Sequence, residues 1–275
     1  MKTFVPLSPK KCVLAFGCAC ALAPIAHGVT LLHYWDFEGG YNDKAGASNG
    51  TAGAEVSTIT GQDGNTGAFF PSAVTGGGAF DSTGYVDIAP ATNVSGAFSM
   101  SYWVQLPADT STDGRGIFDF SGDGGDGPQS LFIQSGGNAG NLAFRVDGSG
   151  TSNAVAFVTV PEDNSWFHIA ANFDPSGNLA VYLNGTPSAS VLASGVADAT
   201  WDVDQYLGAF NVNTLATRGL NGGLDDVAIF SGLLTESEIS GLADRSLTPP
   251  DLVPEPSTGL LVGLSGLALL LRRRK

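Results

Sequence analysis

Acidic side chains are the groups in this 275-residue chain that could most readily do chemistry. Glu38, Asn42 and Asp43 follow the first strand that the sequence predicts, and Asp225 and Asp226 lie in the last one. Calcium takes about six to eight oxygen ligands from carboxylates, amides and backbone carbonyls. If the first and last strands are neighbours, these residues would converge, and we expect them to hold one structural Ca²⁺. The alternative is that they serve turns in an acidic protein.

A second acidic loop contains Asp119, Asp123 and Asp126. Its spacing differs from the Asp-x-Asp-x-Asp-Gly pattern of a calcium-binding loop. A solvated loop is therefore the expected structure, and a second cation site is the alternative.

Residues for catalysis are sparse. Retaining glycosidases need two carboxylates about 5–5.5 Å apart, and no predicted strand carries Glu and Asp spaced along one face. His33 and His168 are the histidines beyond the N-terminal segment, and neither lies in a Gly-x-Ser-x-Gly or metal-ligand motif. The sequence predicts a non-catalytic protein, with a polysaccharide hydrolase or lyase as the alternative.

Three aromatic side chains are candidates for ligand contact. Trp166 and His168 share one side of a predicted strand, and Phe167 and Ile169 share the other. Trp201 lies in the turn-like segment Asp-Ala-Thr-Trp-Asp-Val-Asp-Gln, so it is the tryptophan that we most expect to be exposed. An exposed indole stacks on a sugar ring, but indoles are more often part of the core. For Trp166 and His168 a structural role is the preferred interpretation and ligand contact is the alternative, whereas for Trp201 a structural role is the alternative.

The charge distribution excludes one class of partner. The net charge of the whole chain is −14, and between Val29 and Val253 five basic residues stand against 25 acidic ones, a net charge of −20. Such a body repels phosphate backbones, so nucleic acid is not an expected partner.

Residues 1–28 have the pattern of a secretory signal peptide. Lys2, Lys10 and Lys11 precede an apolar stretch, which ends in small residues suited to signal peptidase. We therefore expect export across the inner membrane. The three cysteines, Cys12, Cys18 and Cys20, all lie in this segment, so the mature chain has none. The alternative is a lipoprotein signal in which Cys18 or Cys20 is lipidated.

Short β-type segments separated by Gly, Asn, Asp and Pro fill residues 29–246. Asn184-Gly185 predicts a hairpin, and Thr235 with Glu238 predicts the capping box of one helix. This pattern predicts an all-β, two-sheet antiparallel sandwich with one short helix near its C-terminal side. Residues 247–252 predict an extended Pro-rich linker. The predicted strands are 31–37, 84–88, 97–106, 117–120, 130–134, 141–146, 155–160, 166–173, the hairpin 178–191, 205–209 and 224–230.

Five blocks of sequence, in order, resemble the laminin-G-like, or concanavalin-A-like, jelly roll of many bacterial surface proteins. The most similar block is the Trp-x-His strand at Trp166 with the hairpin that follows it. The resemblance implies a jelly roll, and it implies a structural Ca²⁺ near Asp225 and Asp226, where the closing Asp of the family is expected. The blocks are residues 31–51, 76–88, 98–107, 165–187 and 219–242.

The tail, residues 253–275, resembles the PEP-CTERM sorting signal. Its apolar stretch 259–271 is 13 residues long, about 20 Å as a helix, whereas a lasting span needs about 20 residues. We expect it to enter the membrane transiently with its basic end, residues 272–275, at the cytoplasmic face; a permanent anchor is the alternative. The residues that carry the resemblance are Val253, Pro254, Glu255, Pro256, Arg272, Arg273 and Arg274.

The PEP-CTERM resemblance implies an exosortase as partner, in a Gram-negative bacterium that makes exopolysaccharide. The sequence thus predicts a protein that is membrane-bound before processing and lies on the cell surface or in the extracellular matrix afterwards. Its jelly roll is expected to bind carbohydrate or another surface component. A structural exopolysaccharide-matrix protein without a defined ligand is the remaining alternative.

Overall fold

A computed structural model of the chain describes residues 28–71, 84–90, 92–108, 114–121, 127–133, 137–148, 153–193, 201, 204–210 and 218–253. The predicted signal peptide up to residue 27 and the sorting tail beyond Val253 lie outside the described residues. So do Asp123 and Asp126 of the second acidic loop.

The first layer of the molecule is an eight-stranded antiparallel sheet with the order β13-β12-β11-β6-β17-β4-β3, in which β1 also pairs with β17. The first and last long strands are therefore neighbours, as the sequence predicts. The strands are β1 (Thr30–Trp35), β3 (Ser57–Thr60), β4 (Thr66–Phe70), β6 (Phe98–Gln105), β11 (Trp166–Phe173), β12 (Asn178–Leu183), β13 (Thr186–Leu192) and β17 (Gly222–Ser231).

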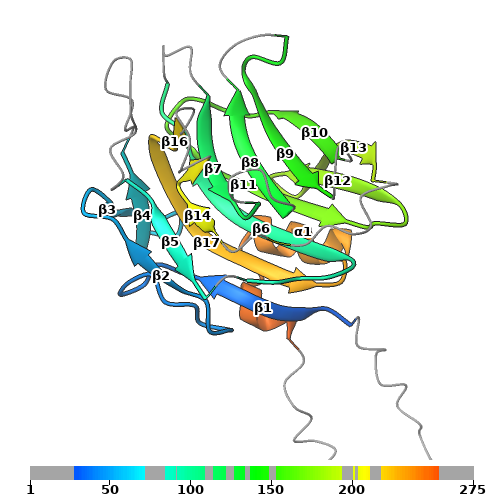
Figure 1. The fold of residues 1–275 in the computed structure, drawn as a ribbon, viewed down its shortest axis with the longest axis horizontal. Coiled ribbons are helices and arrows are strands. Elements are labelled where there is room, and N and C mark those ends of the chain that lie inside the picture. Colours follow the sequence, from blue (N-terminus) through cyan, green and yellow to red (C-terminus); the bar gives the residue numbers. More distant parts are fainter. Residues whose placement is uncertain are drawn as a thin grey trace, which may run out of the picture.

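The second layer is a seven-stranded antiparallel sheet with the order β10-β9-β8-β7-β14-β5-β2, stacked on the first (Figure 1). A small two-stranded sheet of β15 (Ala209–Phe210) and β16 (Arg218–Gly219) accompanies them. The strands of the seven-stranded sheet are β2 (Asn49–Ala52), β5 (Val86–Ala89), β7 (Arg115–Asp119), β8 (Gly127–Ile133), β9 (Asn141–Asp147), β10 (Asn153–Thr159) and β14 (Gln205–Leu207).

The main core fills the space between the two sheets because alternate strand residues point inward. In β11, Phe167 and Ile169 belong to this core and Ala170 belongs to a cluster on the opposite face. In β6, the inward residues are Phe98, Met100, Tyr102 and Val104. The alternation predicted for both strands is confirmed.

The helix α1 (Glu236–Ala243) covers one end of the outer face of the eight-stranded sheet. Its Ile239 and Leu242 pack in one cluster with Ala170, Ala228 and Phe230 of the sheet. The predicted capping box is present: the Thr235 side chain accepts a hydrogen bond from the Glu238 N–H, and the Glu238 carboxylate accepts one from the Thr235 N–H. In the described part of the chain, no helix is long and apolar enough to cross a membrane.

The segment after α1 corrects the prediction of an extended linker over residues 247–252. Pro249–Leu252 form a 3₁₀ helix, η1, in which Pro249 is buried. Leu252 packs against the cluster under α1, and Asp251 accepts hydrogen bonds from the N–H and the hydroxyl of Thr248. Burial of this apolar surface outweighs the extended preference of the two prolines, so the folded domain continues to the start of the sorting motif.

Candidate functional site

The calcium ligands predicted from the sequence lie in two separate environments. Asp43 is buried beside β1 and caps its own loop: its carboxylate accepts hydrogen bonds from four backbone N–H groups, those of Tyr34, Ala45, Gly46 and Ser48. It also pairs with Nδ1 of His33 at 2.7 Å. Burial by itself would raise the pKa of Asp43, but these hydrogen bonds lower it to about 2. Asp43 is thus a loop-capping residue.

Asp225 and Asp226 lie on the other side of β1, at a bulge of β17. Asp225 accepts hydrogen bonds from the N–H groups of Gln62 and Asp226. Burial, followed by the neighbouring charge of Asp226, raises the pKa of Asp225 to about 7. Burial also raises the pKa of Asp226, although Tyr34 and Arg245 act in the opposite direction.

The structure does not bring the predicted ligand set together. Glu38 accepts a hydrogen bond from the Thr66 N–H, and Asn42 is exposed. Among the residues that the structure describes, no three His, Cys, Asp or Glu side chains gather as a metal site. The predicted convergence is not found among them, because Asp43 is held by the backbone of its own loop, whereas Asp225 and Asp226 lie at the bulge of β17.

These carboxylates instead connect distant elements. Arg245, after α1, pairs with Asp226 of β17 and with Asp63 of the β3–β4 turn. Tyr34 of β1 donates a hydrogen bond to Asp226. The network fixes the end of the domain against both the first and last strands.

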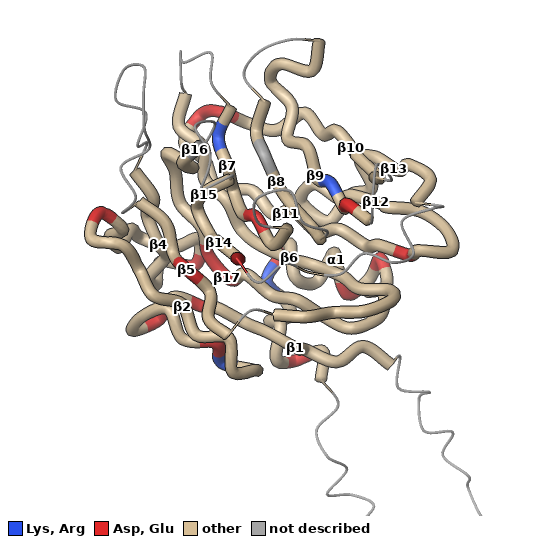
Figure 2. The backbone as a smooth tube through the Cα atoms, in the orientation of Figure 1, with Lys and Arg blue, Asp and Glu red and all other residues tan. Residues whose placement is uncertain are grey.

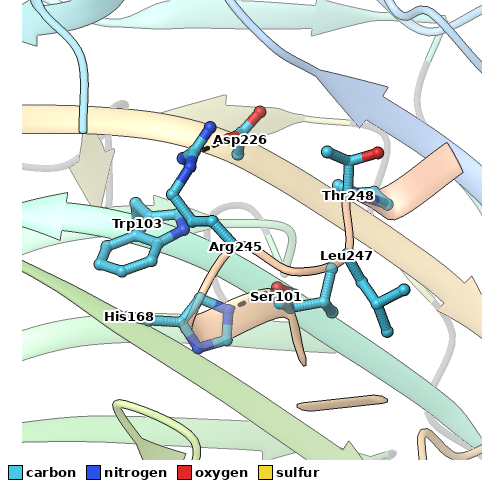
Figure 3. Close-up of a pocket in the computed structure, with 9 residues that line it drawn as sticks. Ser101, Trp103, His168, Asp226, Arg245, Leu247 and Thr248 are labelled. Atoms are coloured by element: carbon cyan, nitrogen blue, oxygen red, sulfur yellow. Dashed lines mark hydrogen bonds and ion pairs between the residues drawn. The ribbon is translucent and has the colours of Figure 1, made fainter. Parts of the chain in front are cut away.

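A serine–histidine pair lies in a small pocket under this network (Figure 3). Oγ of Ser101 is 2.8 Å from Nε2 of His168, but both side chains are buried. The pocket around them is also lined by Leu242, Leu247 and Pro249. Burial lowers the pKa of His168 to about 3, and its Nδ1 has no hydrogen-bond partner. A catalytic histidine needs an oriented, accessible ring. His168 therefore has a structural role, which is the interpretation preferred from the sequence, and it is not placed to contact a ligand.

The two tryptophan candidates have different environments. Trp201 is 6% exposed, stacks on Phe120 and meets Phe98 edge-on. Its predicted exposure was wrong, because packing in the core between the sheets outweighs the polar character of its surrounding sequence. Trp166 is half-buried on the outer face of the eight-stranded sheet, as alternation in β11 predicts.

A groove on the outer face of the seven-stranded sheet is the better candidate for a binding site. Gln129 of β8, Arg145 of β9 and Val155 of β10 are paired across three adjacent strands and form one row. Phe157, 38% exposed, stands beside this row. The remaining lining residues are Ile133, Ala143 and Phe210.

Asp147 fixes the polar side of this groove. One of its carboxylate oxygens accepts a hydrogen bond from Nε of Arg145 at 2.6 Å, and the other accepts one from Nε2 of Gln129 at 2.7 Å. The Arg145 side chain is 43% exposed, so its guanidinium is held by Asp147 through Nε and still faces solvent. The groove thus combines an exposed guanidinium with an apolar ring, which suits a ligand that has both hydroxyl groups and an apolar C–H face.

Arg145, Gln129 and Phe157 do not stand out in the sequence as site residues. The alternation in β9 and β10 places Arg145 and Phe157 outward, so each could have been read as a surface residue. Their meeting in one groove depends on the pairing register of three strands, which alternation alone does not give.

The family comparisons agree with this architecture. Residues 80–240, more than half of the chain, match the family model of the concanavalin A-like lectin/glucanases superfamily, and the chain belongs to that superfamily. Residues 252–275 match the PEP-CTERM protein-sorting motif. No curated protein sequence matches the chain.

Solved structures share the fold at low sequence identity. The botulinum neurotoxin serotype G binding domain has a TM-score of 0.62 at 15% identity, over 79% of this chain and 51% of that one. The serotype D ligand-binding domain in complex with N-acetylneuraminic acid has 0.58 at 14%, over 74% and 47%. This chain therefore spans about half the length of these toxin domains.

A third structure is matched over nearly its whole length. It is domain 4 of AbnA, a GH43 extracellular arabinanase from Geobacillus stearothermophilus, in complex with arabinotriose. Its TM-score is 0.57 at 20% identity, over 78% of this chain and 98% of that one. At such identities the likeness shows the fold alone.

Proposed function

We propose that this protein is an exported, non-catalytic carbohydrate-binding protein, which its PEP-CTERM tail delivers to the cell surface or extracellular matrix. The observation that carries the proposal is the groove on the seven-stranded sheet, where Asp147 holds Arg145 and Gln129 beside the exposed ring of Phe157. Sugar-binding domains among the structures with this fold support it.

The charge of the protein narrows the ligand to neutral glycans. Acidic residues outnumber basic ones over the described domain (Figure 2). A polymer of like charge would be repelled, whereas a neutral sugar chain meets no such barrier. Arg145 then acts as a hydrogen-bond donor to hydroxyl groups.

Binding should depend on both sides of the groove. We expect Arg145→Ala and Phe157→Ala each to weaken binding of a neutral polysaccharide at the groove by about tenfold, equivalent to about 1.4 kcal/mol. Affinity electrophoresis over a polysaccharide panel, followed by calorimetry with the best ligand, measures the change. The matched control is Leu192→Ala, which removes an exposed apolar side chain from a strand of the other sheet. Equal affinity of wild type and both groove variants would refute the groove as the site.

The same panel tests the absence of catalysis. We expect bound polysaccharide to keep its chain length, with no new reducing ends and no unsaturated products. The buried, neutral His168 beside Ser101 supports this expectation. Turnover by the purified wild-type protein would instead favour the hydrolase or lyase alternative.

The signal peptide and the PEP-CTERM motif together predict two new chain ends. The PEP-CTERM match supports processing by an exosortase after signal peptidase has removed the N-terminal segment. Intact mass spectrometry of the protein from its native host is expected to show termini near Val29 and near Pro254. A full-length C-terminus in the membrane fraction would support the permanent anchor.

A further inference from the structure

A row of uncharged residues crosses the outer face of the eight-stranded sheet, on the side of the molecule opposite the groove. Trp166 of β11 pairs with Gln105 of β6, and Gln105 pairs with Gly223 of β17. Gly223 pairs in turn with Phe69 of β4, which pairs with Ser57 of β3. Because paired residues of neighbouring strands point to the same face, the five positions form one continuous line.

The indole of Trp166 lies down along this row. A Cβ at Gly223 would be 2.7 Å from Cη2 and 3.0 Å from Cζ2 of Trp166, although the two residues are separated by strand β6. Two strand spacings amount to about 9.6 Å, which an indole standing upright on β11 could not cross. Because Gly223 has no side chain, the indole can lie directly over it. The ring buries Gly223, whereas Trp166 itself stays partly exposed.

The neighbours of the indole complete a surface suited to sugar. Nε2 of Gln105 donates a hydrogen bond to the carbonyl of Asn164, so the side chain is fixed and its own carbonyl oxygen remains an acceptor. Phe69 is half-buried on the far side of Gly223. The row carries no charge, although the net charge of the chain is −14. A neutral polymer with apolar C–H faces and hydroxyl groups fits this surface better than an ionic one.

We propose that Trp166, Gln105 and Phe69 form a second binding surface for a neutral polysaccharide. The surface and the groove lie on the outer faces of opposite sheets and therefore point in opposite directions. One domain then holds two polysaccharide chains at once and cross-links them. The cross-linking role rests on the proposed function of the groove, whereas binding at the Trp166 surface does not.

Tryptophan fluorescence reports on this surface directly. The other three tryptophans are buried, with exposures of 0% for Trp35, 7% for Trp103 and 6% for Trp201. We expect titration with the polysaccharide that the wild type binds to change the emission of Trp166 in a saturable way, and we expect the change to be absent in Trp166→Ala. A wild-type titration without any change of emission, despite binding measured by calorimetry, would overturn the proposal.

A second variant tests whether binding needs the indole of Trp166 in this position, and not only its presence. Gly223→Ala keeps the indole but places a methyl group in its space, so the ring must move. We expect Trp166→Ala and Gly223→Ala to weaken binding at this surface by about tenfold or more, while Leu192→Ala does not. Thermal melting of each variant checks that the fold is intact. If both variants bind as the wild type does, the proposal is refuted.

Cross-linking distinguishes the two sites. The wild type is expected to raise the viscosity of a soluble neutral polysaccharide, and light scattering checks that it does so as a monomer. Trp166→Ala and Arg145→Ala should each retain binding at the other face and lose the viscosity increase. If Trp166→Ala loses all binding and Arg145→Ala binds as the wild type does, the groove is refuted as a site and the surface proposed here is kept. The reverse pattern would refute this surface and keep the groove.

Discussion

Replacing Trp201 with alanine is expected to lower the free energy of unfolding by about 3–5 kcal/mol, as for other large-to-small core substitutions. The ring centroid of Trp201 is 5.5 Å from that of Phe120, with the planes 14° apart, and 5.3 Å from that of Phe98. Removal of the indole would leave a cavity between the two sheets. Urea unfolding followed by circular dichroism measures the loss.

Trp201→Phe is the matched control for this substitution. Phenylalanine keeps an aromatic ring in the core, and the indole N–H that it removes has no hydrogen-bond partner in the structure. We expect it to cost less than about 2 kcal/mol, and we expect the folded fraction of both variants to bind polysaccharide normally. A Trp201→Ala protein of unchanged stability that no longer binds would instead assign Trp201 to a ligand site.

Asp225→Asn is expected to become more stable relative to the wild type as the pH rises from 4.5 to 8. Burial, followed by the neighbouring charge of Asp226, raises the pKa of Asp225 from the ordinary 3.8 to about 7. A carboxyl with a raised pKa stabilises the fold fully below its unfolded pKa, and this contribution is lost as the pH rises through the folded pKa. Asparagine does not titrate, so the difference between the two proteins should grow by on the order of 2–4 kcal/mol.

The comparison of pH values isolates the buried charge from other effects of the substitution. Asparagine at position 225 also changes the hydrogen bond from the Gln62 N–H, but that cost is present at both pH values. Asp244→Asn is the control, because Asp244 is exposed and the hydroxyl of Ser246 lowers its pKa. Its stability relative to the wild type should stay constant over this range. Parallel curves for Asp225→Asn and wild type would contradict a raised pKa at Asp225.

Much of the fold could be predicted because its signals are local. The alternation in β6 and β11 separates core from surface within eight residues, and both strands appear where expected. The capping box at Thr235 is likewise confined to one turn. The three strands β2, β3 and β4 were missed, since they are four or five residues long and rich in Gly, Thr and Ser.

The candidate sites were harder to predict because they depend on contacts between distant residues. Asp43 and Asp226 both lie near β1. Asp43 caps a loop and pairs with His33, whereas Asp226 binds Tyr34 and Arg245. Trp201 has a polar local sequence but lies in the core. In each case the sequence gives the residue type, and the fold decides its neighbours.

By itself, the sequence determined the all-β class, the inward face of the longest strands, the helix start and the sorting tail. Each of these follows from a pattern of adjacent or alternating residues that acts over a few positions. Only the tertiary structure decided that Arg145 and Phe157 line one groove, and that the indole of Trp166 lies over Gly223. The reason is physical: strand order and register are fixed by packing of the whole core, and they bring together residues that are far apart in the chain.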